Sequence, residues 1–223
     1  MKKCVSIFSL VLAFVFNYSI AQSERCEKLD KALDAPLNQY NLDLSSCEIA
    51  SLPAGFVSME NLMFLDLSSN DIKFLPQNFG NLAKLSMLNL QDNSIAALPA
   101  SISNLKELTS LQLAENQIPK IPAVLGNLTN LNYLGLTRNL LKSIPSTIGK
   151  LTELNSLDID YNSIETLPEE IGSLKKLSSL NASNNLITEL PKGLFGLKTL
   201  AYLNLTSNNI SAICPDIKNL KNL

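Results

Sequence analysis

The sequence contains no histidine and no tryptophan, and only 6% of its residues are aromatic. Because histidine is absent, Ser-His-Asp and Cys-His catalytic arrangements are excluded, as are zinc sites that use histidine. The eight glycines are mostly single and fall at regularly spaced turns, unlike those of a glycine-rich phosphate loop. We therefore expect no enzyme, and we predict no catalytic residue, no bound metal and no cofactor.

Charged residues are also scarce, at 17% of the chain, and nearly balanced, with 18 basic and 20 acidic side chains. The two signs are interspersed, and no basic patch stands out. Recognition of nucleic acid depends on clustered lysine and arginine. Nucleic acid is therefore not an expected partner.

Long apolar runs are nearly absent, and the only one spans residues 5–16, where just Ser6 and Ser9 are not apolar. It follows Lys2 and Lys3 and precedes Ser19-Ile20-Ala21, a pattern typical of a secretory signal peptide with cleavage after Ala21. The run of about a dozen residues is too short to span a bilayer permanently. We predict that residues 1–21 are a signal peptide and that the protein is secreted, periplasmic or on the cell surface, without stable membrane insertion.

What the chain has in abundance is leucine at a fixed spacing. The pattern LxxLxLxxNxIxxLPxxIGxL recurs eight times at intervals of 23 residues, with no insertion or deletion. In the second copy two leucines, Leu65 and Leu67, alternate with outward-facing residues, as in a half-buried strand. A turn of this length, interrupted by proline and glycine, leaves room only for short 3₁₀ or extended segments on the return path. The polar residue that ends each strand must find hydrogen-bond partners in neighbouring copies; these residues are Cys47, Asn70, Asn93, Asn116, Asn139, Asn162, Asn185 and Asn208.

The string LPxxIGxLxxLxxLxLxxNxI, seen from Leu167 to Ile187, resembles the 23-residue leucine-rich repeats of plant Ras-group-related proteins, receptor-kinase ectodomains and secreted bacterial proteins. We accordingly predict an α/β solenoid, a leucine-rich-repeat horseshoe with a parallel concave sheet of about eight strands. The resemblance implies binding of a protein or peptide on that sheet.

The ends of the stack need caps, because a terminal layer would otherwise expose its leucines. Residues 22–38 are expected to form an N-terminal cap helix, over residues 23–34, and a lead-in that Pro36 helps to end. Residues 39–223 form the repeat domain, in which no C-terminal cap is evident. The last layer is therefore expected to self-associate or to open first.

Three cysteines follow the predicted cleavage site, and two of them lie close to the first repeat. A disulfide between Cys26 and Cys47 would close the N-terminal cap in an oxidising compartment. The alternative is that both are small buried apolar residues, because Cys47 already occupies the strand-ending position of its repeat.

The outward-facing columns of the sheet are where we expect specificity to lie, with exposed aromatic residues as anchors. Gly135 is predicted to leave a gap beside Tyr133. The Asp and Asn residues of the middle column are more consistent with a general feature of the repeat than with a binding role. The candidate ligand-binding residues are Phe64, Met87, Tyr133, Arg138, Asp158, Asp160, Tyr161 and Tyr202.

Together these observations predict an exported, non-enzymatic binding scaffold that recognises a protein or peptide through its concave face. The alternative is a structural or surface component, such as an adhesin or a stacking subunit, that associates through its C-terminal end.

Overall fold

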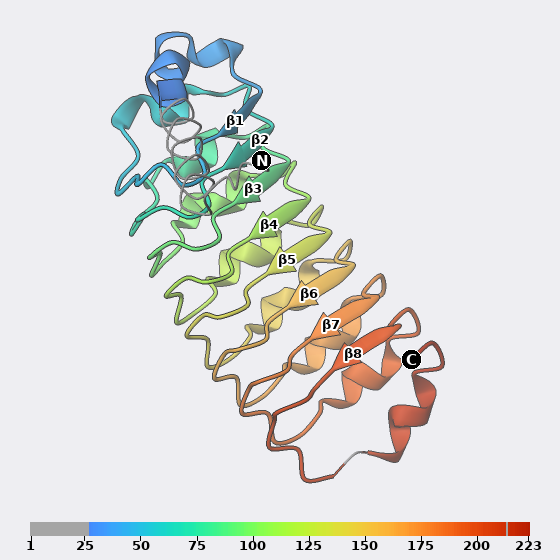
Figure 1. The fold of residues 1–223 in the computed structure, drawn as a ribbon. Helices are drawn as coiled ribbons and strands as arrows, with labels where there is room; N and C mark the ends of the chain where they lie inside the picture. Colours follow the sequence, from blue (N-terminus) through green and yellow to red (C-terminus); the bar gives the residue numbers. More distant parts are fainter. Residues whose placement is uncertain (1–26, 213) are drawn as a thin grey trace, which may run out of the picture.

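The computed structural model describes residues 27–212 and 214–223. Eight three-residue strands form one parallel sheet in sequence order, and Figure 1 shows them side by side along an elongated, curved stack. This confirms the predicted solenoid. The strands are β1 (Asn41–Asp43), β2 (Phe64–Asp66), β3 (Met87–Asn89), β4 (Ser110–Gln112), β5 (Tyr133–Gly135), β6 (Ser156–Asp158), β7 (Ser179–Asn181) and β8 (Tyr202–Asn204).

Short 3₁₀ helices lie on the opposite, convex side of the stack, as the interrupted return path predicted. Most of them begin directly after a proline, whose ring fixes φ near the helical value while its carbonyl accepts the first turn's hydrogen bond. In the described residues they are η1 (Pro36–Asn38), η2 (Ala54–Ser58), η3 (Phe79–Asn81), η4 (Ala100–Asn104), η5 (Ala123–Asn127), η6 (Ser146–Lys150), η7 (Glu169–Ser173), η8 (Lys192–Gly196) and η9 (Pro215–Asn219).

The convex turns pack closely because the repeat places a glycine there. A Cβ atom on Gly172 would lie 2.5 Å from the carbonyl oxygen of Gly193 and 2.7 Å from its Cα atom, in the next turn. The absent side chain therefore sets how near successive 3₁₀ helices approach each other.

A continuous leucine core lies between the sheet and the convex turns. The strands pair in exact 23-residue register, so that Leu65 faces Leu88 and every inward leucine stacks on its equivalent. Leu65, Leu111, Leu134 and Leu157 are completely buried. Because each repeat is covered only by its neighbours, this burial depends on stacking rather than on any single repeat.

A ladder of asparagine side chains ends the strands and links the repeats. Asn116 is buried, and its Nδ2 donates to the carbonyls of Leu90 (2.8 Å) and Leu113 (3.1 Å), while its Oδ1 accepts from the Ile95 amide at 2.9 Å. The partners are therefore backbone groups of the preceding repeat, at Leu90 and Ile95, and of the same repeat, at Leu113. In the first repeat, the amide of Cys47 donates to Asn70 Oδ1 at 3.0 Å.

The residue before each ladder position adopts a left-handed backbone. In all eight repeats its φ lies between 52° and 57°, although none of these residues is glycine. The conformation costs roughly 1–3 kcal/mol for such residues and persists where the surroundings impose it. Here the turn lets the following side chain reach into the stack; the residues are Ser46, Ser69, Asp92, Glu115, Arg138, Tyr161, Asn184 and Ser207.

A helix covers the first layer of the described chain. Residues 27–34 are helical, Ala32 is buried, and Leu29 and Leu33 pack against the core. The predicted start of this helix and Cys26 lie outside the described residues, so the disulfide with Cys47 stays a prediction. At the other end, Leu203, Leu205, Ile210 and Ile217 are only partly buried.

Candidate functional site

The concave sheet brings most of the sequence-predicted candidates into adjacent columns. Phe64 lies beside Met87, and Tyr133 beside Ser156, because the register aligns every 23rd residue. Met87 and Tyr202 are exposed, whereas Phe64 and Tyr133 are half-buried. Tyr202 is in β8, far along the stack from Phe64 in β2, so the candidates do not form one compact cluster.

The middle column is chiefly structural, as its composition indicated. Asp66 Oδ1 accepts hydrogen bonds from the amide (2.8 Å) and the hydroxyl (2.6 Å) of Ser68, which holds the chain as it leaves the strand. The same two-residue link recurs from repeat to repeat. The side chains that accept it are those of Asp43, Asp66, Asn89, Gln112, Asn181 and Asn204.

Repeats five and six depart from this arrangement. Gly135 has no side chain to form the link, and in this fully described part of the chain Asp158 forms none with Asp160. The Asp158 carboxyl instead interacts with the Tyr133 hydroxyl, and this interaction contributes to the pKa shifts of both groups. That hydroxyl also accepts from Gln112 Nε2 at 3.1 Å, so Tyr133 bridges repeats four and six.

The gap predicted beside Gly135 is not open. A Cβ atom on Gly135 would lie 2.1 Å from Gln112 Oε1 and 2.7 Å from the Tyr133 hydroxyl. The two side chains fold over the glycine and fill its space. The expectation of a pocket was therefore wrong, because sequence does not show which way a tyrosine ring will lean.

The pKa values of Asp158 and Tyr133 are both raised from their ordinary values. Burial raises the pKa of the Asp158 carboxyl, and the charge of Asp160 raises it further, whereas the hydrogen bond from Tyr133 opposes the change. Burial also raises the pKa of the Tyr133 hydroxyl, and Asp158 adds to this through its charge and its hydrogen bond. Asp160 is itself buried at 8% exposure and accepts a 2.6 Å hydrogen bond from the Thr137 hydroxyl.

Arg138 and Tyr161 lie beyond the strand ends, in the left-handed turns. The Arg138 guanidinium carbon is 4.4 Å from the centroid of the Tyr161 ring, within cation–π range. Tyr161 is 47% exposed, so the stacked pair presents a rigid, partly apolar surface to solvent. This pair and the Tyr133–Asp158 pair both come from repeats five and six.

A second exposed surface was missed by sequence reasoning. Tyr40 and Met63, each just before its strand, are 54% and 49% exposed, and the Tyr40 carbonyl accepts from both Met63 (2.7 Å) and Phe64 (3.1 Å). Together with Phe64 and Met87 they form an N-terminal apolar patch. The sequence signal was available, because equivalent positions in repeats three to seven are polar; they are Ser86, Thr109, Asn132, Asn155 and Ser178.

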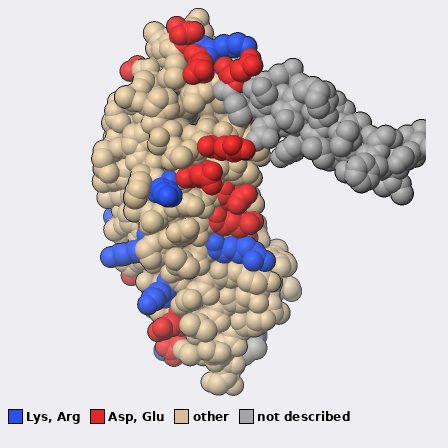
Figure 2. All heavy atoms as spheres, turned by 60° about the vertical axis from the view of Figure 1, so that its left-hand side comes forward, with Lys and Arg blue, Asp and Glu red and all other residues tan. Residues whose placement is uncertain are grey.

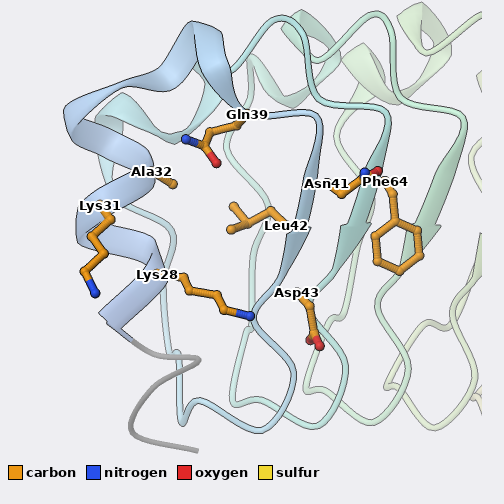
Figure 3. A pocket seen from close by; sticks show the side chains of 8 residues that line it. All are labelled: Lys28, Lys31, Ala32, Gln39, Asn41, Leu42, Asp43 and Phe64. Atoms are coloured by element: carbon orange, nitrogen blue, oxygen red, sulfur yellow. The ribbon is translucent and has the colours of Figure 1, made fainter.

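A pocket of about 300 Å³ adjoins this patch, between the N-terminal helix and β1. Figure 3 shows Lys28 and Lys31 on the helix side, Leu42 behind the opening and the Phe64 ring on the sheet side. Cationic and apolar groups therefore meet around this cavity. Elsewhere, Figure 2 shows one largely uncharged face, with acidic side chains along one side of its upper half and basic ones interspersed.

In the part of the chain that the structure describes, no three His, Cys, Asp or Glu side chains are grouped as metal ligands. A search of the same residues finds no helix long and apolar enough to cross a membrane.

Comparison with known proteins agrees with the geometry. A family model described as a leucine-rich repeat region matches residues 42–132 and 123–223. The chain belongs to the leucine-rich-repeat family. No protein among those with curated functions matches the sequence.

Solved leucine-rich-repeat structures are similar over most of this chain. A protein of Leptospira interrogans is 28% identical with a TM-score of 0.67, over 87% of this chain and 61% of that one. The ectodomain of the Arabidopsis thaliana receptor kinase GASSHO1/SCHENGEN3, solved in complex with CASPARIAN STRIP INTEGRITY FACTOR 2, is 32% identical with a TM-score of 0.61, over 79% and 25%. InlJ of Listeria monocytogenes, at 24% identity and a TM-score of 0.63 over 86% and 44%, shares the fold. This chain thus spans less than two thirds of the length of each of these proteins.

Proposed function

We propose that this leucine-rich-repeat protein is an exported, non-enzymatic scaffold that binds a protein or peptide through its concave face. The observation that carries the proposal is the departure at repeats five and six. There Gly135 and Asp158 do not form the link that ends other strands, and Arg138 stacks on Tyr161. Aromatic and arginine side chains held rigidly on a surface are frequent binding hot spots.

The half-buried Asp158 carboxyl adds polar specificity to this surface. Its pKa is raised by burial, so a ligand that offers hydrogen-bond donors there would compensate a group that the fold leaves incompletely solvated. The open shape of the sheet suits an extended or folded polypeptide better than a small molecule. The plant ectodomain solved with its partner supports the same kind of use for this fold.

A pull-down from the native organism tests the proposal, with wild-type protein and a Tyr133→Ala/Arg138→Ala variant as baits. Partners should be recovered by the wild type and lost by the variant. The matched control is Phe74→Ala/Lys142→Ala, which also removes one exposed aromatic and one exposed cation, outside the concave columns. Equal recovery by wild type and the Tyr133→Ala/Arg138→Ala variant would move the binding site away from repeats five and six.

Export is tested separately by N-terminal sequencing and intact mass of the protein recovered outside the cytoplasm. The mature chain should begin at Gln22, with Lys2 and Lys3 removed. A recovered protein that retains both lysines would contradict the signal-peptide assignment.

A second candidate function is self-association through the eighth repeat. It is favoured by the partial exposure of Leu203, Leu205, Ile210 and Ile217, whose equivalents in inner repeats are buried. Sedimentation equilibrium should then show a dimer that Leu203→Glu disrupts, whereas a monomer at all concentrations would exclude this function.

A further inference from the structure

The pocket between the N-terminal helix and β1 has the parts of a subsite for a single residue. Ala32 and Leu42, which are 1% and 2% exposed, form its apolar base, and the Phe64 ring forms one wall. Its volume of about 300 Å³ is at the lower end of the range for ligand pockets, enough for one apolar side chain and its main chain. An apolar side chain would therefore be taken out of water here.

The charged residues that line the pocket are Lys28, Lys31 and Asp43. Lys28 reaches from the helix across the opening, and no hydrogen bond or ion pair joins its ammonium group to a described residue. Lys31 lies 3.6 Å from Glu27, but both side chains are more than 60% exposed, and such surface pairs contribute little. Asp43 Oδ1 is already used by the amide and hydroxyl of Ser45. Figure 3 shows Lys28 extending across the opening and Lys31 extending along the outer side of the helix, so the Lys28 ammonium group is the one placed to meet an incoming carboxylate.

The position of the pocket limits what kind of chain can enter. The helix covers the end of the sheet beyond β1, with Leu29 and Leu33 packed on the core. The helix would block a polypeptide that lies across the strands and continues past β1. The end of a chain fits such a place, whereas a segment that continues in both directions does not.

We infer that this pocket holds the C-terminal residue of a peptide or protein ligand. Its apolar side chain packs between Leu42 and Phe64, and its α-carboxylate pairs with Lys28. The preceding residues of the ligand lie on the N-terminal apolar patch, where Met63 and Met87 can adapt their shape to different side chains. This inference rests on the proposed function and assigns the end of the ligand to one place on the concave side.

Affinity selection with two matched synthetic hexapeptide libraries tests it. Both are randomised, and one ends in a free carboxylate and the other in a carboxamide. The full chain should enrich carboxylate peptides that end in a bulky apolar residue. Amidation of an enriched peptide should weaken binding by about tenfold, the usual scale for losing one hydrogen-bonded charge, as measured by fluorescence anisotropy.

Variants test the cationic and the apolar side chains of the pocket separately. Lys28→Gln/Lys31→Gln should bind the carboxylate and carboxamide forms equally, and Phe64→Ala should weaken both. Lys120→Gln/Lys142→Gln, which removes two exposed lysines away from the pocket, should behave as wild type. Equal binding of the two forms by the wild type, a full carboxylate preference in Lys28→Gln/Lys31→Gln, or no enrichment at all would overturn the inference.

The inference and the proposed function can fail separately. The libraries report only on the pocket, whereas the pull-down with Tyr133→Ala/Arg138→Ala reports on repeats five and six. If that variant loses partners and no peptide is selected from the libraries, the pocket inference is wrong and the proposed function stands. If that variant keeps its partners and carboxylate peptides are selected, repeats five and six are not the main contact surface.

Discussion

The guanidinium of Arg138 stacks on the ring of Tyr161 because the two residues occupy the same place in successive repeats. Both have a left-handed backbone, with φ of 54° and 52°, and the 23-residue register brings them side by side. The turn that the fold requires therefore also holds a cation over an aromatic ring. The same left-handed backbone conformation thus serves both the repeat fold and the Arg138–Tyr161 pair of the candidate site.

That conformation predicts a specific sensitivity at Asp92, which has φ of 55° and an exposed side chain. Asp92→Val should lower the free energy of unfolding by about 1–3 kcal/mol, because β-branched residues are strained in the left-handed region. Asp92→Gly should cost much less. Urea unfolding of both variants measures the difference, and equal stabilities would show that this turn relaxes to another conformation.

The asparagine ladder predicts a large loss on truncation of Asn116. Asn116→Ala would leave the buried Leu90 and Leu113 carbonyls and the Ile95 amide without this partner. The cost should be about 2–4 kcal/mol, since each unsatisfied buried group costs about 1–3 kcal/mol before relaxation. Asn78→Ala is the control, because Asn78 is exposed and makes no side-chain cap bond. Similar unfolding midpoints in urea for the two variants would argue against the ladder's energetic role.

The convex turns allow a test with one methyl group at two glycines. Gly172→Ala should destabilise by about 1–3 kcal/mol, because the new atom overlaps the Gly193 backbone. Gly196→Ala should have little effect, since the nearest atom that a new Cβ would meet among the described residues is Nζ of Lys175, at 3.9 Å. Thermal unfolding followed by circular dichroism compares the two. A stable Gly172→Ala protein would mean that the convex turns can separate without loss.

The raised pKa of Asp158 predicts how stability changes with pH. The folded state holds this proton more tightly than the unfolded chain, whose Asp pKa is about 3.9. The resulting contribution is complete below that value and is lost as the pH rises through the folded-state pKa. Ionised Asp158 should therefore disfavour folding at neutral pH.

Asp158→Asn should accordingly raise Tm at pH 7, with a difference that narrows as the pH falls to 4. Asp66→Asn is the matched control, because an amide can keep the link to Ser68, as Asn89 does for Gln91 in the next repeat. Differential scanning calorimetry across this pH range gives the comparison. A Tm for Asp158→Asn below that of wild type at pH 7 would contradict the prediction.

The fold could be predicted from sequence because its information is repeated. Eight copies in exact register assign Leu65 and Leu88 to the same inward column and Asn116 to the ladder without any structure. The strands are shorter than the alternating pattern suggested, since β2 ends at Asp66 and the next residues already turn. The period defines columns, but it does not define where hydrogen bonding between strands stops.

The candidate site could be predicted only in part, because it depends on how individual side chains lean. Sequence placed Tyr133 beside Gly135 correctly but could not show that the hydroxyl would reach Asp158 and close the gap. It also missed Tyr40 and Met63, which precede their strands and so lie outside the columns that were read. Comparing each position with its seven equivalents, rather than reading only the strands, would have found both.

The unbroken register also bears on how such a gene changes length. Any two equivalent points 23 residues apart can be joined without disturbing the pairing of Leu42, Leu65 and the leucines that follow. Unequal recombination between neighbouring copies would then add or remove one whole repeat in frame. The molecule can thus evolve a longer or shorter reach in steps of one strand, while the chemistry at either end of the stack stays unchanged.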